Sequence, residues 1–524
     1  MEKSRPDHGP TPTQGRSLLE QMRRSSRGTV WRLLLVFSIY ALLLFLEALP
    51  GSHLVEAAHE EAQTSLSLPF VPPLWALTPF ALLLFIIAVF PLLSQTQDWW
   101  HHNRNRFLVA VILGGSTLLY YGLIHPGGLK NHFTHLASST AGWETLWAAF
   151  SNAIFSEFIP FIVLLFSLYV ISGGINLSGD LPAHPATNTA FIALGAILAS
   201  FIGTTGAAMV LIRPLILTNI EREYKVHTIL FFIFCACNCG GLLLPIGDPP
   251  LFLGYLRGVP FTWTLVLWPY WLLVNSILLA VYFVWDWIVY RKEALRDLIR
   301  DELQVQPLRL SGTINLLWIL GVILSVALIL PGQPFLGTGF HPPVYLRETV
   351  MLLFVILSLL STDANIRMRN RFNYVAITEV AALFSGIFIC MQIPIEILDV
   401  MGAQLGIDTP FEFFWFTGVL SSVLDNAPTY VVFFETAVSL PIMEGFSALP
   451  LPEGEVIMEH LLAAISLGAV FMGANTYIGN GPNFMVKSIA EQSGIRMPSF
   501  FGYVGYSVLI LTPIFVLVSL LLSL

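Results

Sequence analysis

The sequence predicts an all-α polytopic membrane protein, and three observations support this fold class. Of its 524 residues, 55% are hydrophobic and only 11% are charged, whereas soluble domains average roughly 25% charged residues. Apolar stretches of about 20 residues, the length that crosses a bilayer, recur along the chain. The 39 Phe and 13 Trp residues exclude a disordered chain. We expect about 11 transmembrane helices plus two re-entrant hairpins, arranged in two inverted repeats.

Eleven apolar stretches are candidate membrane crossings. They are Leu33–Leu49, Leu74–Ser94, Phe107–Ile124, Leu146–Ile171, His227–Gly247, Trp263–Val289, Ile314–Leu330, Val350–Leu360, Ile377–Ile397, Leu461–Ile478 and Phe500–Leu522. The Val350–Leu360 stretch is the weakest candidate, because Arg347 and Glu348 stand close to its start.

Two further apolar regions, 191–217 and 411–440, are interrupted in the middle by residues that break helices. Gly203–Gly206 divides the first region and Asp425–Thr429 divides the second. Each half is too short to span the bilayer, and a broken helix at membrane depth survives only inside protein or beside a wet cavity. We therefore expect two re-entrant hairpins. The alternative is one ordinary helix with a polar kink in each region.

The basic residues test this topology, because Lys and Arg concentrate on the cytoplasmic side of a membrane. With the N-terminal tail inside and both hairpins non-crossing, only Lys130, Arg257 and Arg347 fall outside. Arg213 lies within the first hairpin. A crossing first hairpin would instead place the basic 291–312 linker outside. We expect a multi-pass protein of the plasma (inner) membrane with a cytoplasmic N-terminus.

The chain divides into five regions. They are a disordered cytoplasmic tail, 1–30; N-terminal transmembrane helices, 31–106; a first repeat, 107–290, with its hairpin at 191–217; a cytoplasmic linker, 291–312; and a second repeat, 313–524, with its hairpin at 411–440. The first helix, Leu33–Leu49, follows three arginines, so a cleaved signal peptide is the alternative to a retained helix. Its length and Glu47 favour the retained helix.

Corresponding residues of the two repeats recur at one offset. Glu157 precedes Glu379 by 222 residues, and Gly203 at the first hairpin break precedes Asp425 at the second by the same 222 residues. In the predicted topology the Glu157 span runs inward and the Glu379 span runs outward, so the repeats are inverted. A helix interrupted by Gly, Asn and Pro follows each hairpin. Inverted repeats with broken helices are typical of secondary transporters, whose sites lie near the membrane midplane.

Polar residues at these breaks are the candidate binding site. Asp248 and Asp425 lead, because an ionisable group at membrane depth is costly and usually functional; the alternative is that each only caps a half-helix. Candidate oxygen donors, or caps of broken backbone, are Thr204, Thr205, Asn238, Asn426, Thr429, Asn475, Thr476 and Asn480. Candidates for proton transfer are Asp248, Asp425, Glu157 and Glu379, although both glutamates also suit an interfacial helix end.

This chemistry predicts a transporter that exchanges a cation, with Na⁺ as the leading candidate, for protons. A buried carboxylate that binds either Na⁺ or H⁺, but not both together, is sufficient for exchange. We expect no cofactor and no metal beyond transported Na⁺. The net charge of −8 gives no reason to expect nucleic-acid binding. We expect no enzymatic activity, because the chain lacks the Walker A, His-Glu-x-x-His and Gly-x-Ser-x-Gly motifs.

Three segments resemble a known family. The Gly-Gly and Pro-Ile-Gly-Asp-Pro-Pro sequences within 237–254, together with Leu-Asp-Asn-Ala-Pro-Thr at 424–429 and the asparagine-rich segment 474–484, resemble the signature of the ion transporter superfamily. The nearest branch is the NhaD-like sodium/proton antiporter and citrate-transport group, over about residues 74–524. This resemblance implies a two-repeat homodimer that moves its hairpin-bearing unit past a scaffold. Carboxylate-transporting members carry Ser-Asn-Thr at both hairpin tips. The absence of Ser-Asn-Thr here argues against citrate, and the presence of Asp425 favours a cation site.

Two other functions stay open. Transport of citrate or another carboxylate, by symport or exchange, is the first alternative, so the expected partners are the bilayer and a small ion or carboxylate. An intramembrane aspartyl protease built on Asp248 and Asp425 is a distant alternative. Pro249 and Pro250 follow Asp248 directly, and the inverted repeat has no role in such an enzyme.

Overall fold

The computed structural model describes residues 12–45, 70–91, 93–131, 136–137, 141–330, 334–443 and 445–523. Within these residues the chain is almost entirely helical, with three two-stranded sheets, which confirms the all-α class. Seven of the described helices are long and apolar enough to cross a membrane, and shorter apolar helices accompany them. The chain is a multi-pass membrane protein.

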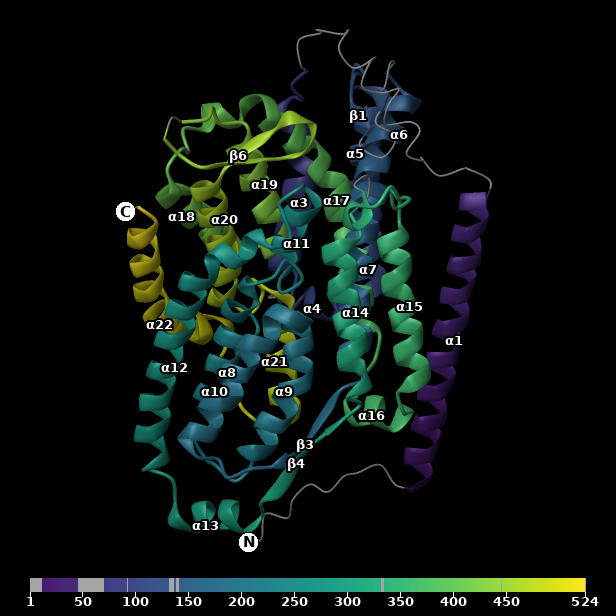
Figure 1. Cartoon of the computed structure of the whole chain (residues 1–524). Coiled ribbons are helices and arrows are strands. Elements are labelled where there is room, and N and C mark those ends of the chain that lie inside the picture. Colours follow the sequence, from purple (N-terminus) through teal and green to yellow (C-terminus); the bar gives the residue numbers. More distant parts are fainter. Residues whose placement is uncertain are drawn as a thin grey trace.

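The first helix group packs around α7. In Figure 1, α1, α7, α14 and α15 run side by side on the right, and α5 packs along α17. This group comprises α1 (Pro12–Phe45), η1 (Leu74–Leu77), α3 (Thr78–Val89), α4 (Gln97–Trp100), α5 (Asn103–Leu123), α6 (Trp143–Ser151), the π-helix η2 (Asn152–Phe158), α7 (Ile159–Ser172), α14 (Ile314–Leu328), η5 (Phe335–Gly337), α15 (Leu346–Ser361), α16 (Ala364–Arg369), α17 (Val375–Met401) and η6 (Gly402–Leu405).

The second helix group occupies the left of Figure 1 and contains both hairpins and both broken helices. It comprises α8 (Pro185–Ile202), α9 (Thr204–Thr218), α10 (Val226–Ala236), η3 (Cys239–Leu242), α11 (Pro249–Leu256), η4 (Trp263–Leu267), α12 (Trp268–Tyr290), α18 (Pro410–Val423), α19 (Asn426–Val438), η7 (Pro452–Gly454), α20 (Glu459–Met472), η8 (Gly473–Asn475), α21 (Gly481–Gln492) and α22 (Phe500–Leu522).

The predicted linker contains regular structure that joins it to the base of the first hairpin. It holds α13 (Leu295–Leu303) and strand β4 (Gln306–Ser311), which pairs antiparallel with β3 (Asn176–Asp180). Asp301 accepts a hydrogen bond from the backbone N–H of Ala183 at 2.8 Å. Two shorter sheets pair β1 (Lys130–Asn131) with β2 (Leu136–Ala137) and β5 (Ala448–Pro450) with β6 (Val456–Met458).

The α8–α9 and α18–α19 pairs are helical hairpins. Asn188 near the start of α8 exchanges hydrogen bonds of 2.9 and 2.7 Å with Asn219 just beyond α9, so both arms end together. In Figure 1 the α8–α9 pair lies in the lower half and the α18–α19 pair in the upper half. Re-entry into a bilayer and the inverted repeat stay predictions.

The first arm of the first hairpin is longer than expected. Helix α8 begins at Pro185 rather than near residue 191, and the 18 residues of α8 equal a short membrane span in length.

The N-terminal tail and the second crossing also differ from expectation. Residues 12–30, expected to be disordered, form the first part of α1, because Leu, Gln, Glu, Met and Arg are strong helix formers. Residues 1–11 lie outside the described part. The second crossing is shorter than Leu74–Ser94, since α3 ends at Val89, just before Pro91.

The weakest predicted crossing, near Val350–Leu360, is a regular 16-residue helix, α15. Its first turn contains Arg347 and Glu348, both buried, whose side chains form an ion pair at 2.5 Å. Pairing neutralises the two charges, which is why they do not prevent an apolar helix from starting at Leu346.

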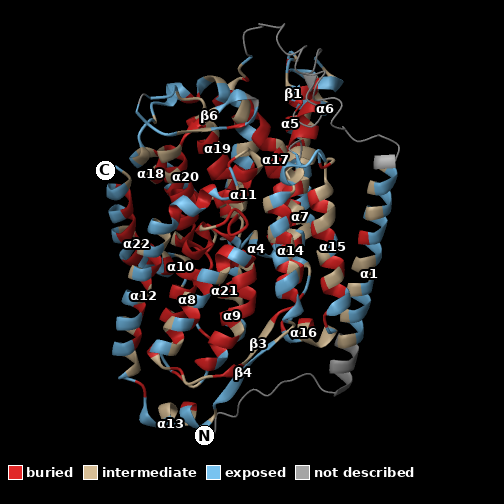
Figure 2. Ribbon diagram, viewed as in Figure 1, coloured by how far each residue is buried: buried red, intermediate tan, exposed pale blue. Residues whose placement is uncertain are grey.

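The outer surface of the helix bundle is apolar. Figure 2 shows largely exposed outer faces on α1, α12 and α22, around a buried interior. The exposed residues on these faces include Leu35, Val284 and Leu509. A continuous apolar exterior of this kind is suited to lipid rather than water.

The C-terminal end of α7 is held by side chains of the α15–α17 connection. Arg367 is buried, and its guanidinium donates to the carbonyl of Val170 at 2.5 Å and to Ser358 Oγ at 2.7 Å. The Asn370 amide donates to the carbonyls of Gly173 and Ile175. These donors satisfy carbonyls that the end of a helix leaves unpaired, and the positive charge of Arg367 complements the helix dipole.

We expect Arg367→Ala to destabilise the protein by about 1–3 kcal/mol, because it leaves buried acceptors without donors. The measurement is thermal unfolding of the detergent-purified chain. Arg369→Ala is the matched control, since Arg369 is exposed on the same helix. Equal unfolding temperatures for the two variants would contradict the capping role of Arg367.

Candidate functional site

Asp248 lies at the point where both hairpins and both broken helices meet. It immediately precedes α11 and is 1% exposed. Its carboxylate accepts hydrogen bonds from Thr204 Oγ1 (3.2 Å), Asn426 Nδ2 (2.6 Å) and Asn480 Nδ2 (3.0 Å). Thr204 belongs to the first hairpin tip and Asn426 to the second, whereas Asn480 belongs to the second broken helix. Four of the predicted site residues are therefore in direct contact.

The two broken helices have the same local construction. Asp248 and Asn480 each stand just before the second half-helix, in extended backbone conformations with φ/ψ of −142°/143° and −152°/139°. A proline follows within two residues of each, at a position suited to the first turn of a helix. Asn480 thus occupies the place in the second broken helix that Asp248 occupies in the first.

Glycines allow the interrupted backbone to fold back on itself. A Cβ on Gly247 would collide with the carbonyl oxygen of Gly241, and a Cβ on Gly479 would lie 2.6 Å from that of Gly473. Gly203, at the first hairpin tip, has a φ of 76°, which favours glycine. A larger residue at any of these three positions would displace the neighbouring backbone of the helix break or hairpin tip.

Four helices begin at the site. Thr204 starts α9 and Asn426 starts α19, while α11 and α21 start just after Asp248 and Asn480. Asp425 caps α19, because its carboxylate accepts the backbone N–H of Ala427 at 3.1 Å. Converging helix N-termini create a positive potential, which stabilises a carboxylate placed among them.

The remaining predicted oxygen donors lie around this centre. The Asn475 amide donates to Ser422 Oγ (2.9 Å), Thr476 Oγ1 donates to the Ser422 carbonyl (2.6 Å), and Thr429 Oγ1 donates to the Asp425 carbonyl (3.1 Å). Thr205 is half-buried next to Thr204. Asn475, Thr476 and Thr429 order the backbone of the second hairpin tip and of the second break, and none of these hydrogen bonds goes to Asp248.

Three buried amide oxygens near the breaks have no hydrogen-bond partner within the described residues. They are the Oδ1 atoms of Asn238, Asn426 and Asn475. Buried polar oxygens are normally satisfied, so unpaired ones in a functional centre are candidate ligands for a cation. The same centre contains no Lys, Arg or His side chain in contact with Asp248, among the residues that the structure describes.

Asn483 was not predicted as a site residue, yet it links the two broken helices. It is fully buried, accepts from Asn238 Nδ2 at 2.8 Å, and donates to the carbonyls of Gly473 and Thr476, both at 2.9 Å. The available signal was its spacing: Asn483 follows Asn480 by three residues, so it lies in the first turn of α21, next to the break.

The two glutamates predicted for proton transfer are paired with arginines. Glu379 contacts Arg106 at 2.8 Å. Glu157 contacts Arg257 at 3.0 Å, and Arg257 also contacts Glu435 of α19 at 2.6 Å. None of these glutamates touches Asp248 among the printed contacts of its carboxylate. Their ion pairs give them a packing role that the sequence did not reveal.

Arg257 and Arg347, two of the three basic residues predicted outside, both form ion pairs; Arg347 is buried and Arg257 is partly buried. Their predicted positions on the outer side, where Lys and Arg are rare, were the sequence signal that these two arginines pair with acidic residues inside the protein. Arg257 lies at the C-terminal end of α11, whose N-terminal end carries Asp248. A cation is favourable at a helix C-terminus, so this short helix links the central carboxylate to the Glu157–Arg257–Glu435 cluster.

A family model described as "Putative citrate transport" matches residues 71–523. No curated protein matches the chain.

We expect Arg257→Gln to destabilise the protein strongly, by about 3–5 kcal/mol, because it leaves Glu157 and Glu435 buried without a counter-charge. Thermal unfolding in detergent measures the loss. Adding Glu435→Gln to Arg257→Gln should recover part of it, since only one buried carboxylate then remains. Arg296→Gln, in the exposed part of α13, is the control. A double variant no more stable than Arg257→Gln would contradict the pairing.

Proposed function

The chain belongs to the Putative citrate transport family, and we propose that this membrane transporter is a sodium/proton antiporter that works by alternating access. The family indicates a transporter rather than an enzyme. It gives no reason to retain an aspartyl protease, and the donors nearest Asp248 are amide and hydroxyl groups rather than a second carboxyl group.

The observation that carries the proposal is a buried carboxylate without a protein cation. Transfer of a carboxylate into a low-dielectric interior is costly unless it is protonated, hydrogen-bonded or paired. Asp248 has three neutral donors and no basic partner among the described residues. A mobile cation or a proton supplies the missing positive charge, and one carboxylate that holds either of them alternately couples their movements.

Oxygen atoms suited to Na⁺ lie in the hairpin tips and broken helices that meet at this carboxylate. The unpaired Oδ1 atoms of Asn238, Asn426 and Asn475 add neutral oxygens, and Asp425 adds a second carboxylate at the adjacent hairpin tip. Hard cations prefer such oxygen ligands. Rotation of the amides of Asn426 and Asn480 would turn their oxygens toward a bound ion and remove their donors from Asp248.

Alternating access follows from the two helix groups. The second group, with both hairpins and both broken helices, carries the site, and it moves relative to the first group between the two faces of a plasma (inner) membrane. The protein functions as a homodimer with a cytoplasmic N-terminus, and it needs no cofactor. In this scheme both hairpins are re-entrant and their tips meet near the midplane.

Citrate transport is the second candidate function. The family description favours it, and so do the N-termini of α9, α11, α19 and α21, which converge on the site and attract anions. A citrate anion would approach Asp248 and Asp425, so its binding would require accompanying cations to offset the repulsion. The two functions therefore differ in which solute moves, and both use the same centre.

Transport in everted membrane vesicles distinguishes these candidates. We expect added Na⁺ or Li⁺ to dissipate an imposed pH gradient in vesicles that contain the protein, and we expect no dependence on citrate. K⁺ should have a smaller effect. Uptake of labelled citrate together with no response to Na⁺ would reject antiport and support the second candidate.

Asp248→Asn and Asp425→Asn test the two carboxylates. Each variant should fold with a near-normal unfolding temperature, because Asn is nearly isosteric with Asp, yet Na⁺-driven proton movement should fall to the level of vesicles without the protein. Asp363→Asn, at an exposed helix cap, is the matched control and should retain exchange. Exchange at normal ion affinity in either site variant would remove that carboxylate from the mechanism.

A further inference from the structure

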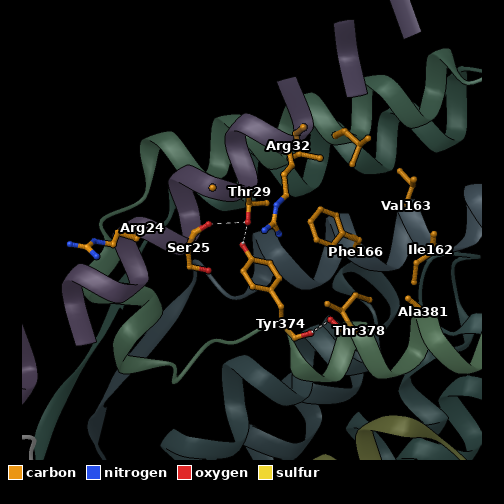
Figure 3. A pocket seen from close by; sticks show the side chains of 14 residues that line it. Arg24, Ser25, Thr29, Arg32, Ile162, Val163, Phe166, Tyr374, Thr378 and Ala381 are labelled. Carbon is orange, nitrogen blue, oxygen red and sulfur yellow. Dashed lines mark hydrogen bonds between the residues drawn. The ribbon is translucent and has the colours of Figure 1, made fainter. Parts of the chain in front are cut away.

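A cavity separates α1 from the rest of the first helix group. It is a partly open cavity of about 530 Å³, lined by residues of α1, α7, α15 and α17 together with Tyr374. Figure 3 shows the side chains that line this cavity. A Cβ placed on Gly28 of α1 would meet nothing within 4 Å, so the helix leaves open space here. This cavity has no part in the proposed ion site.

One side of the cavity is polar and carries an unpaired positive charge. The side chain of Arg32 points into the cavity in Figure 3, and no hydrogen bond or ion pair is formed by it within the described part of the chain. Thr29 Oγ1 contacts the hydroxyl of Tyr374 at 3.2 Å beside it. Arg24 lies at the edge and extends outward. The polar side therefore offers a cation and hydroxyl groups to an anionic ligand.

The other side is apolar. Ile162, Val163 and Phe166 of α7 and Leu352 of α15 form it. Arg32 directly precedes the apolar part of α1, which begins at Leu33, so the cavity lies where the predicted cytoplasmic interface meets the hydrocarbon. A cavity with a positively charged polar side and an apolar side suits a molecule with an anionic headgroup and a hydrocarbon tail.

We propose that this cavity binds an anionic glycerophospholipid of the cytoplasmic leaflet. Its phosphate contacts Arg32 and the hydroxyls of Thr29 and Ser25, and an acyl chain lies against Phe166 and its neighbours. A free phosphate would leave the apolar wall uncovered. Basic pockets between transmembrane helices on this side of a membrane suit anionic headgroups. The lipid joins α1, which is largely exposed along its length, to the helix bundle.

The test uses the full chain, purified in detergent and freed of lipid. Bound lipid is counted by native mass spectrometry, and the unfolding temperature is followed, after adding dioleoylphosphatidylglycerol, dioleoylphosphatidylcholine or inorganic phosphate. We expect phosphatidylglycerol to bind and to raise the unfolding temperature. Neither phosphatidylcholine nor phosphate should match it. Equal binding of the zwitterionic lipid, or equal stabilisation by phosphate alone, would overturn the proposal.

Three variants locate the binding. Arg32→Gln should weaken phosphatidylglycerol binding about fivefold, the effect of one basic residue near a membrane surface. Arg27→Gln, exposed on the same helix but outside the cavity, should bind as the unchanged protein does. Ala381→Trp keeps the charge but fills the cavity, so it should lose the lipid. Normal binding by Ala381→Trp, or equal losses in the two arginine variants, would reject the lipid site. A fourth variant, Gly28→Cys, tests for a second copy of the chain in the cavity, and a cross-linked dimer would also reject the lipid site.

Discussion

A carboxylate removed from water must be compensated, and the rest of this structure is arranged around one such group. Asp248 lies at the centre of the second helix group with three neutral donors and no basic residue beside it among the described residues. Hydrogen bonds and nearby helix N-termini reduce the cost of its charge without cancelling it. In the function we propose, a proton or a small cation supplies the remaining positive charge at this centre.

The breaks in the helices follow from this constraint. An unbroken helix satisfies its own backbone and offers no N–H ends to a buried anion. The breaks between α10 and α11 and between α20 and α21 expose the ends of half-helices. At each break the backbone turns back on itself, because Gly247 and Gly479 have no side chain to block the close contact with Gly241 and Gly473. The hairpins then bring Thr204 and Asn426 to the same carboxylate. Asn483 joins the two breaks directly, which makes them one unit rather than two separate sites.

Local breaks could be predicted from sequence, whereas long-range pairing could not. Gly, Pro and Asn in apolar surroundings identified Asp248 and its contacts, because each disturbs a helix where it stands. Arg257 pairs with residues 100 and 178 positions away, Glu157 and Glu435, and no local pattern encodes such partners. The sequence therefore suggests proton transfer for Glu157 and Glu379 without revealing that each has an arginine partner, and proton transfer stays a prediction. Helix ends in polar segments also escaped prediction, as the helical residues 12–30 illustrate, because helix propensity acts there without an apolar signal.

The central claim is that Asp248 gives up a proton when a sodium ion binds. Its most direct measurement is proton release from the purified, weakly buffered protein on addition of Na⁺, followed with a pH-sensitive dye at constant ionic strength. We expect release that saturates with Na⁺ and that disappears in Asp248→Asn. Release that is unchanged in Asp248→Asn, or no release from protein that is active in vesicles, would contradict the exchange of Na⁺ and H⁺ at this carboxylate.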